Sequence, residues 1–68
     1  MMGNMLTHKG YVMAKSKAYK EDDVVESYGD LYTVHSHTDV KELLAYDNGG
    51  ELCTVQVKSI SRHWVLAA

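Results

Sequence analysis

A turn-forming tetrapeptide between two β-prone runs constrains the fold of this chain more than any other feature. Residues 43–46 lead into Asp47-Asn48-Gly49-Gly50, and residues 52–57 follow. Asp, Asn and Gly accept positive φ at low cost, so the tetrapeptide predicts a β-hairpin. After the turn, apolar and polar side chains alternate. A period of two places Cys53, Val55 and Val57 on one face, which we interpret as the core side.

The remainder of the chain divides into further short strands joined by turns. Residues 10–15, 24–28, 31–37 and 62–66 each predict a strand, and residues 58–61 predict a single 3₁₀ turn before the last one. Residues 16–23 are polar and charged, and predict a loop or helical turn with Tyr19 folded onto the core. In the third strand we place Tyr32 and Val34 inward, because the opposite register would bury His35 and His37.

The order of these elements resembles that of SH3-like small barrels of the KOW, Tudor and bacterial SH3 kinds. The segments that carry the resemblance are Asp23-Val24-Val25-Glu26, Tyr32-Thr33-Val34, the Asp47–Gly50 turn and residues 55–60 with the closing strand. The resemblance implies a mainly β fold, a small antiparallel barrel of about five strands with a 3₁₀ turn before the last. It covers about residues 19–66. Because the chain shows no repeat, low-complexity tract or linker, we expect one domain over residues 11–68 with a flexible lead over residues 1–10. In length and composition the chain also resembles the short accessory proteins that bacteriophages encode.

Length and charge limit the class of protein further. A 68-residue chain buries only about 60% of its unfolded surface, so its stability should be marginal. The single cysteine excludes an internal disulfide and, with no apolar run near the ~20 residues of a membrane span, predicts a cytoplasmic protein without membrane contact. Seven Lys and Arg against nine Asp and Glu give a net charge of −2, which gives nucleic-acid binding no general support.

Two groups of residues raise the question of chemistry. His35 and His37 alternate on a predicted strand and Asp39 continues the spacing, so a divalent metal is one hypothesis, with Cys53 or His63 completing the site. Exposed polar positions are the interpretation we favour for this pair. Cys53 could act as a nucleophile beside a histidine, but its alternation with the valines favours a packed thiol. We therefore expect no enzyme and no cofactor.

The aromatic and basic residues suggest two classes of binding function. Five tyrosines and one tryptophan exceed what so small a core can bury, so some rings should be exposed and available to a partner. The class we prefer is a non-enzymatic protein-interaction module, as in a phage accessory factor acting on a host protein. The alternative is a nucleic-acid-binding small barrel. The candidate binding residues for these two classes are Tyr28, Tyr46, Trp64, Lys17, Lys20 and Arg62.

Self-association is a further expectation. Strand edges without partners are templates for pairing with another chain. We predict a homodimer with residues 62–66 as the seam, because this strand is terminal and apolar. The competing expectation is a monomer in which residues 1–10 fold over the same edge.

Overall fold

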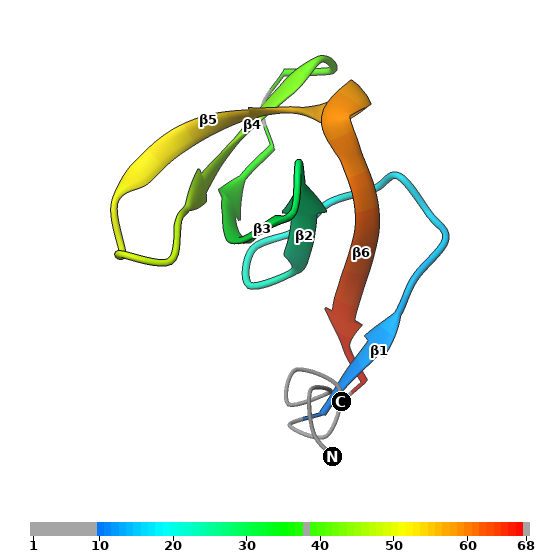
Figure 1. Cartoon of the computed structure of the whole chain (residues 1–68). Coiled ribbons are helices and arrows are strands. Elements are labelled where there is room, and N and C mark those ends of the chain that lie inside the picture. The colour runs from blue at the N-terminus through cyan, green and yellow to red at the C-terminus, as the bar shows by residue number, and fades with distance from the viewer. Residues whose placement is uncertain (1–9, 38, 68) are drawn as a thin grey trace.

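The chain folds into one antiparallel sheet of six strands (Figure 1). The computed structural model describes residues 10–37 and 39–67. The elements are β1 (Tyr11–Met13), β2 (Val24–Ser27), β3 (Asp30–Ser36), β4 (Glu42–Tyr46), β5 (Leu52–Gln56), the 3₁₀ turn η1 (Val57–Ser59) and β6 (Ile60–Leu66). The mainly β fold and the 3₁₀ turn before the last strand are confirmed. In the described part of the chain no helix is long and apolar enough to cross a membrane.

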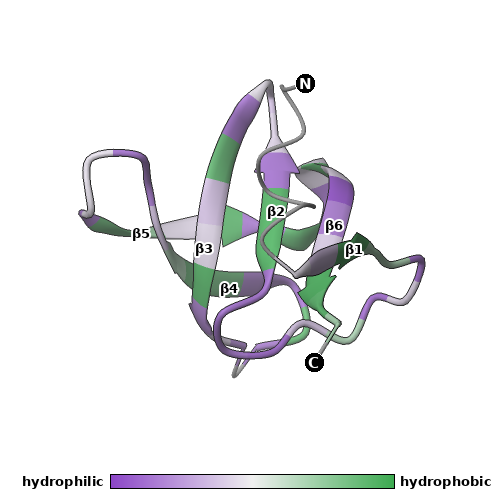
Figure 2. Ribbon diagram, turned by 90° about the horizontal axis from the view of Figure 1, so that it is seen from below, coloured by the Kyte–Doolittle hydropathy of each residue, from purple (hydrophilic) through white to green (hydrophobic). Residues whose placement is uncertain are grey.

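The sheet is strongly curled but does not close into a barrel. Its strand order is β1-β6-β2-β3-β4-β5, so β1 and β5 are the two edges. Figures 1 and 2 show these edge strands on opposite sides of the molecule. Barrel closure needs the two edges to pair, and here they lie too far apart. The predicted closed barrel of about five strands is therefore corrected to an open sheet of six.

The β4–β5 hairpin has the predicted turn and register. The Asp47 carboxylate (Oδ1) accepts hydrogen bonds from the backbone N–H groups of Gly49 at 2.8 Å and Glu51 at 2.9 Å, and Gly50 adopts a φ of 83°. Leu43 pairs with Val55 across the hairpin, and both are buried. Cross-strand partners share a face, so this pair confirms which side of the hairpin faces the core.

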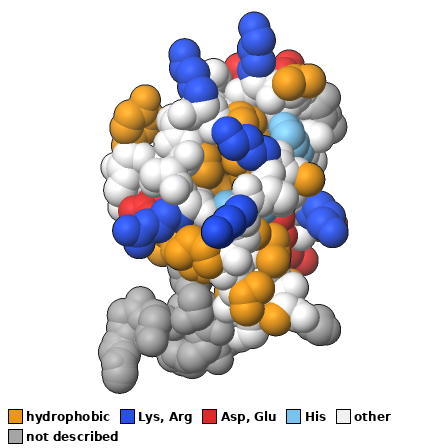
Figure 3. Space-filling view, turned by 90° about the vertical axis from the view of Figure 1, so that its right-hand side faces the viewer, with side chains coloured by type: hydrophobic (Ala, Val, Ile, Leu, Met, Phe, Trp, Pro, Cys, Tyr) orange, Lys and Arg blue, Asp and Glu red, His pale blue; other side chains and the backbone are white. Residues whose placement is uncertain are grey.

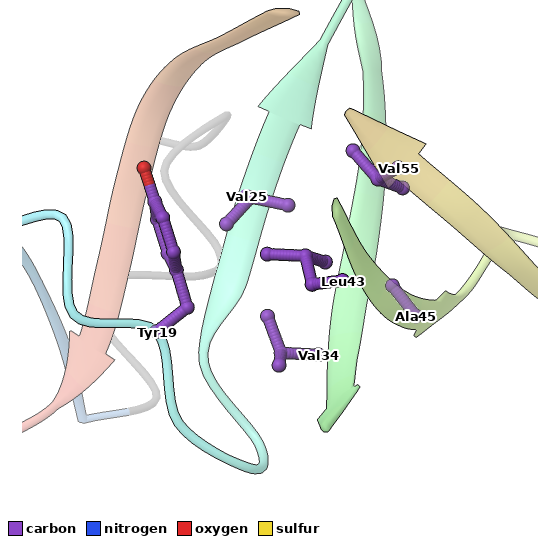
Figure 4. Packing of buried hydrophobic residues seen from close by; sticks show 6 residues of the cluster. All are labelled: Tyr19, Val25, Val34, Leu43, Ala45 and Val55. Atoms are coloured by element: carbon purple, nitrogen blue, oxygen red, sulfur yellow. The ribbon is translucent and has the colours of Figure 1, made fainter. Parts of the chain in front are cut away.

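The core lies inside the curl of the sheet. Its buried side chains come from β2, β3, β4, β5 and the loop before β2, and point toward one another (Figure 4): Tyr19, Val25, Val34, Leu43, Ala45 and Val55. Tyr32, Val57 and Ile60 pack against this cluster. The predicted inward placement of Tyr32 and Val34, and of Tyr19 from its loop, is confirmed.

A bulge in β3 changes which face the following residues occupy. Val34 pairs with Ala45, but Ser36 pairs with Leu44, so His35 is an extra residue on β3. An inserted residue reverses the alternation beyond it. Ser36 therefore shares a face with Leu44, away from the core, and His37 turns back toward Tyr19. The prediction that His35 and His37 project from one face is wrong for this reason.

The last strand lies inside the sheet and is not one of its edges. β6 pairs with β2 on one side, and its end pairs with β1 on the other, Met13 opposite Trp64 and Tyr11 opposite Leu66. The premise of the predicted dimer seam, that residues 62–66 form an edge strand, is therefore wrong: Trp64 pairs with both β1 and β2, Arg62 and His63 pair with β2, and Val65 and Leu66 pair with β1. The competing expectation for residues 1–10 falls almost wholly outside the described residues.

Candidate functional site: a cationic groove

Two adjoining hollows on the face of β6 form an extended concave surface. One has a volume of about 510 Å³ and the other of about 360 Å³, and they share Lys17, Tyr19 and Ile60. We call them together the Tyr19 groove. Five of the chain's seven Lys and Arg residues line it: Lys15, Lys17, Lys41, Lys58 and Arg62. None of the described lining residues is acidic.

The space-filling view (Figure 3) shows how the cations are arranged around the groove. On the face that carries β6 and the loop before β2, Lys and Arg side chains surround an apolar patch (Figure 3). The floor of the groove is formed by Tyr19, Val57 and Ile60, all of which belong to the core or pack against it. A core that opens at one end of the curled sheet therefore presents apolar surface inside a ring of cations.

Backbone contacts between distant segments position these cations. The N–H of Val57 donates to the carbonyl of Lys41 at 2.9 Å, which brings the start of η1, and with it Lys58, to the same rim as Lys41. On the other side, the N–H of Ala14 donates to the carbonyl of His63 at 2.8 Å. This bond holds the loop that carries Lys15 and Lys17 along β6.

A buried histidine–aspartate pair lies beneath this loop. His63 Nε2 is 2.8 Å from Asp23 Oδ2, and both side chains are more than nine-tenths buried. His63 Nδ1 is 3.1 Å from the carbonyl oxygen of Ser16. Both ring nitrogens thus lie within hydrogen-bond distance of oxygen atoms, one on Asp23 and one on Ser16. The pair fastens the groove loop to β6, with the Tyr19 ring centred 4.6 Å from the imidazole.

The groove contains only part of the predicted set of binding residues. Lys17 and Arg62 line it, and Arg62 also contacts Glu26 at 3.5 Å, an exposed pair of small energetic weight. Lys20 lies apart, in a hollow lined also by Glu21 and Asp23.

The predicted aromatic residues do not line the groove. Tyr28 is 88% exposed and Tyr46 is 39% exposed, so both are exposed as predicted. Neither of them lines the groove. Trp64 is only 7% exposed, between β1 and β2 in the sheet, so its predicted role as an exposed binding ring is corrected.

Lys41 and Lys58 were not among the binding residues predicted from the sequence. Their proximity follows from the register of the hairpin, because extending the pairing of Leu43 with Val55 by two residues places Lys41 opposite Val57, the neighbour of Lys58. The net negative charge of the whole chain obscured their local concentration.

The histidines of the metal hypothesis lie in different surroundings. The His35 ring is centred 5.6 Å from that of Tyr46, and the His37 ring 5.5 Å from that of Tyr19. Asp39 accepts a hydrogen bond from the N–H of Lys41 at 2.8 Å. Within residues 10–37 and 39–67 there is no group of three or more His, Cys, Asp or Glu side chains placed to hold a metal ion.

Cys53 should react slowly as a nucleophile at neutral pH. Burial raises the pKa of its thiol, and the negative charges of Asp47 and Glu51 raise the pKa further. The thiolate is the reactive form, so iodoacetamide should alkylate Cys53 more slowly than it alkylates free cysteine at pH 7.5. The midpoint of the rate against pH should also lie higher for the protein. Equal rates and midpoints for the folded protein and a short peptide spanning residues 51–55 would contradict this assignment.

The chain was also compared with known proteins. Comparisons with protein-family models, with curated proteins and with solved structures found no match. The resemblance to SH3-like barrels thus stays a prediction from the strand pattern. The shape and charge of the Tyr19 groove are therefore the features from which a function can be inferred.

Proposed function

We propose that the chain is a non-enzymatic protein-interaction module that binds an acidic segment of another protein in the Tyr19 groove. The observation that carries the proposal is the gathering of five cations, with no acidic neighbour in the lining, around an apolar floor. In a chain of net charge −2 this arrangement separates the charges onto different surfaces. The likeness to short phage accessory proteins suggests a host protein as the partner.

The larger hollow suits an aliphatic side chain of that segment. Its volume of about 510 Å³ lies in the range of small-ligand sites. Val40, which is 86% exposed, stands at its rim, and Val57 and Ile60 form its floor. An apolar side chain bound there would cover this surface, while flanking carboxylates reach the ammonium groups of Lys41 and Lys58.

The groove suits a protein segment better than a nucleic acid. Single-stranded nucleic acids bind to cationic grooves chiefly by stacking their bases on open aromatic rings. The aromatic rings among the described lining residues, Tyr19 and His63, are 8% and 4% exposed and therefore offer no open face. Tyr28 and Tyr46, whose rings are exposed, lie outside the groove.

A labelled peptide of the sequence Asp-Glu-Leu-Leu-Glu-Asp tests the proposal by fluorescence anisotropy. We expect binding that weakens as salt rises, because exposed charges are screened. Charge reversal of Lys17 together with Lys58, both to Glu, should weaken binding by about tenfold or more, since opposed charges become like charges across the site. Replacing both leucines of the peptide by serine should also weaken binding, because the apolar floor then has no ligand.

Lys20→Glu provides the matched control. It makes the same charge change on the same loop as Lys17→Glu, but outside the groove, and should leave the affinity within about twofold. Equal losses for Lys17→Glu and Lys20→Glu would show attraction to overall charge and contradict a defined site. Tighter binding of a 12-nucleotide single strand than of the peptide would replace this proposal with the nucleic-acid class. Absence of peptide binding at low salt would also reject it.

A further inference from the structure

We propose that the β5 edge pairs with β5 of a second copy of the chain, in antiparallel orientation, to form a homodimer. β5 is the last strand in the order of the sheet and pairs only with β4 among the described residues. The other edge strand, β1, has three residues against the five of β5, and so offers a shorter ladder. The β5 edge meets the Tyr19 groove at Gln56 and Lys58, which line the groove, and the rest of the edge lies outside it.

The backbone of β5 carries free hydrogen-bonding groups on its outer side. The N–H of Asp47 donates to Glu51 and the N–H of Val57 donates to Lys41, so residues 51 and 57 turn their backbone groups toward β4. Antiparallel ladders alternate along the strand. Cys53 and Val55 therefore bond to β4, and the N–H and C=O groups of Leu52 and Thr54 and the N–H of Gln56 point outward. The carbonyl of Gln56 instead accepts a hydrogen bond from the Ser59 hydroxyl at 2.7 Å.

The side chains of β5 contain none of the features that prevent an edge strand from pairing with another chain. Soluble proteins protect such edges with charges, proline, bulges or very short strands. The strand reads Leu-Cys-Thr-Val-Gln, without charge or proline, and pairs with β4 in unbroken register. Leu52 is 50% exposed at its start. An edge of this kind favours pairing with another strand.

Charge and pattern favour a second copy in antiparallel orientation. A two-fold axis at Thr54 would place Leu52 opposite the partner's Gln56 and Cys53 opposite the partner's Val55. The inner, apolar face of each sheet would then continue into that of the other. The same axis brings the acidic end of β5 at Glu51 toward the basic end at the partner's Lys58. A parallel pairing would instead bring like charges together at each end.

Sedimentation of the full chain over a concentration series tests the proposal. We expect a mass that rises from 7.6 kDa toward twice that value. Thr54→Lys should raise the dissociation constant about tenfold or more, because two like charges then lie directly opposite each other across the axis. Ser61→Lys, the same charge on an exposed residue of β6, should dimerise like the parent.

A cross-link tests the register. In a Cys53→Ser background, Thr54→Cys should form an intermolecular disulfide readily on mild oxidation, because facing residues of paired strands have Cα atoms within disulfide range. Ser61→Cys in the same background should not. A parent that stays at 7.6 kDa to millimolar concentration would overturn the proposal, as would a dimer that Thr54→Lys and Ser61→Lys weaken equally.

Discussion

Replacing Asp23 with alanine should lower the free energy of unfolding by about 3–5 kcal/mol, the range for breaking a buried, hydrogen-bonded pair by removing one partner. His63 is 4% exposed, and its Nε2 would lose the carboxyl group 2.8 Å away. The N–H of Lys20, which also donates to Asp23, would lose its acceptor. A chain of this length has a total stability of about 3–10 kcal/mol, so the loss in Asp23→Ala should be a large fraction of the total. Urea titration followed by circular dichroism measures the change.

Controls separate the pair from general effects of charge. Asp22→Asn removes a neighbouring carboxylate that is exposed and sits at a φ of 76°, which asparagine accepts, so its effect should stay within about 0.5 kcal/mol. The double variant Asp23→Leu, His63→Leu should lose less than the sum of its single variants, because neither polar side chain of the pair then remains buried without its partner. A stability of Asp23→Ala within about 1 kcal/mol of the parent would contradict a stabilising role of the buried pair.

The local parts of the fold were predictable because neighbouring residues determine them. The Asp47 side chain and the glycines close the β4–β5 turn within five residues, and strict alternation then fixes which side of β5 faces the core. The placement of Tyr19 was predictable for a similar reason, since a large ring in a polar loop gains most by burial.

The long-range parts were not predictable from alternation. The bulge at His35 exists only in relation to β4, so the sequence of β3 alone shows an unbroken pattern and places the two histidines together. β6 looks terminal in the sequence, but Met13 pairs with Trp64 across 50 intervening residues and turns β6 into an inner strand. This pairing also buries Trp64.

The candidate site was partly hidden for the same reason. Lys17 and Arg62 were named from their own stretches of sequence, but the groove forms only when the loop before β2 meets η1 and the start of β4. Net charge sums over the whole surface and therefore says little about one face. Lys41 and Lys58 lie at one rim because the backbone N–H of Val57 donates a hydrogen bond to the carbonyl of Lys41.

Leu43→Ala should destabilise the domain by about 2–5 kcal/mol, the range for removing a buried leucine side chain and leaving a cavity. Leu43 is 2% exposed and is among the largest fully buried side chains, opposite Val55 in the hairpin and within the central cluster. Val55→Ala removes less volume and should cost about 1–3 kcal/mol. Chemical denaturation of the three proteins should thus give the order parent, Val55→Ala, Leu43→Ala.

Leu44 supplies a matched control from the same strand. It is the next residue, it carries the same side chain, and it lies half-buried on the opposite face, beside Ser36 and Thr54. Leu44→Ala should therefore cost clearly less than Leu43→Ala, because less apolar area returns to water and no closed cavity forms. A slip of one residue in the hairpin would exchange the faces of these two leucines. A larger loss for Leu44→Ala than for Leu43→Ala would accordingly show that the register, and the inward face built on it, is wrong.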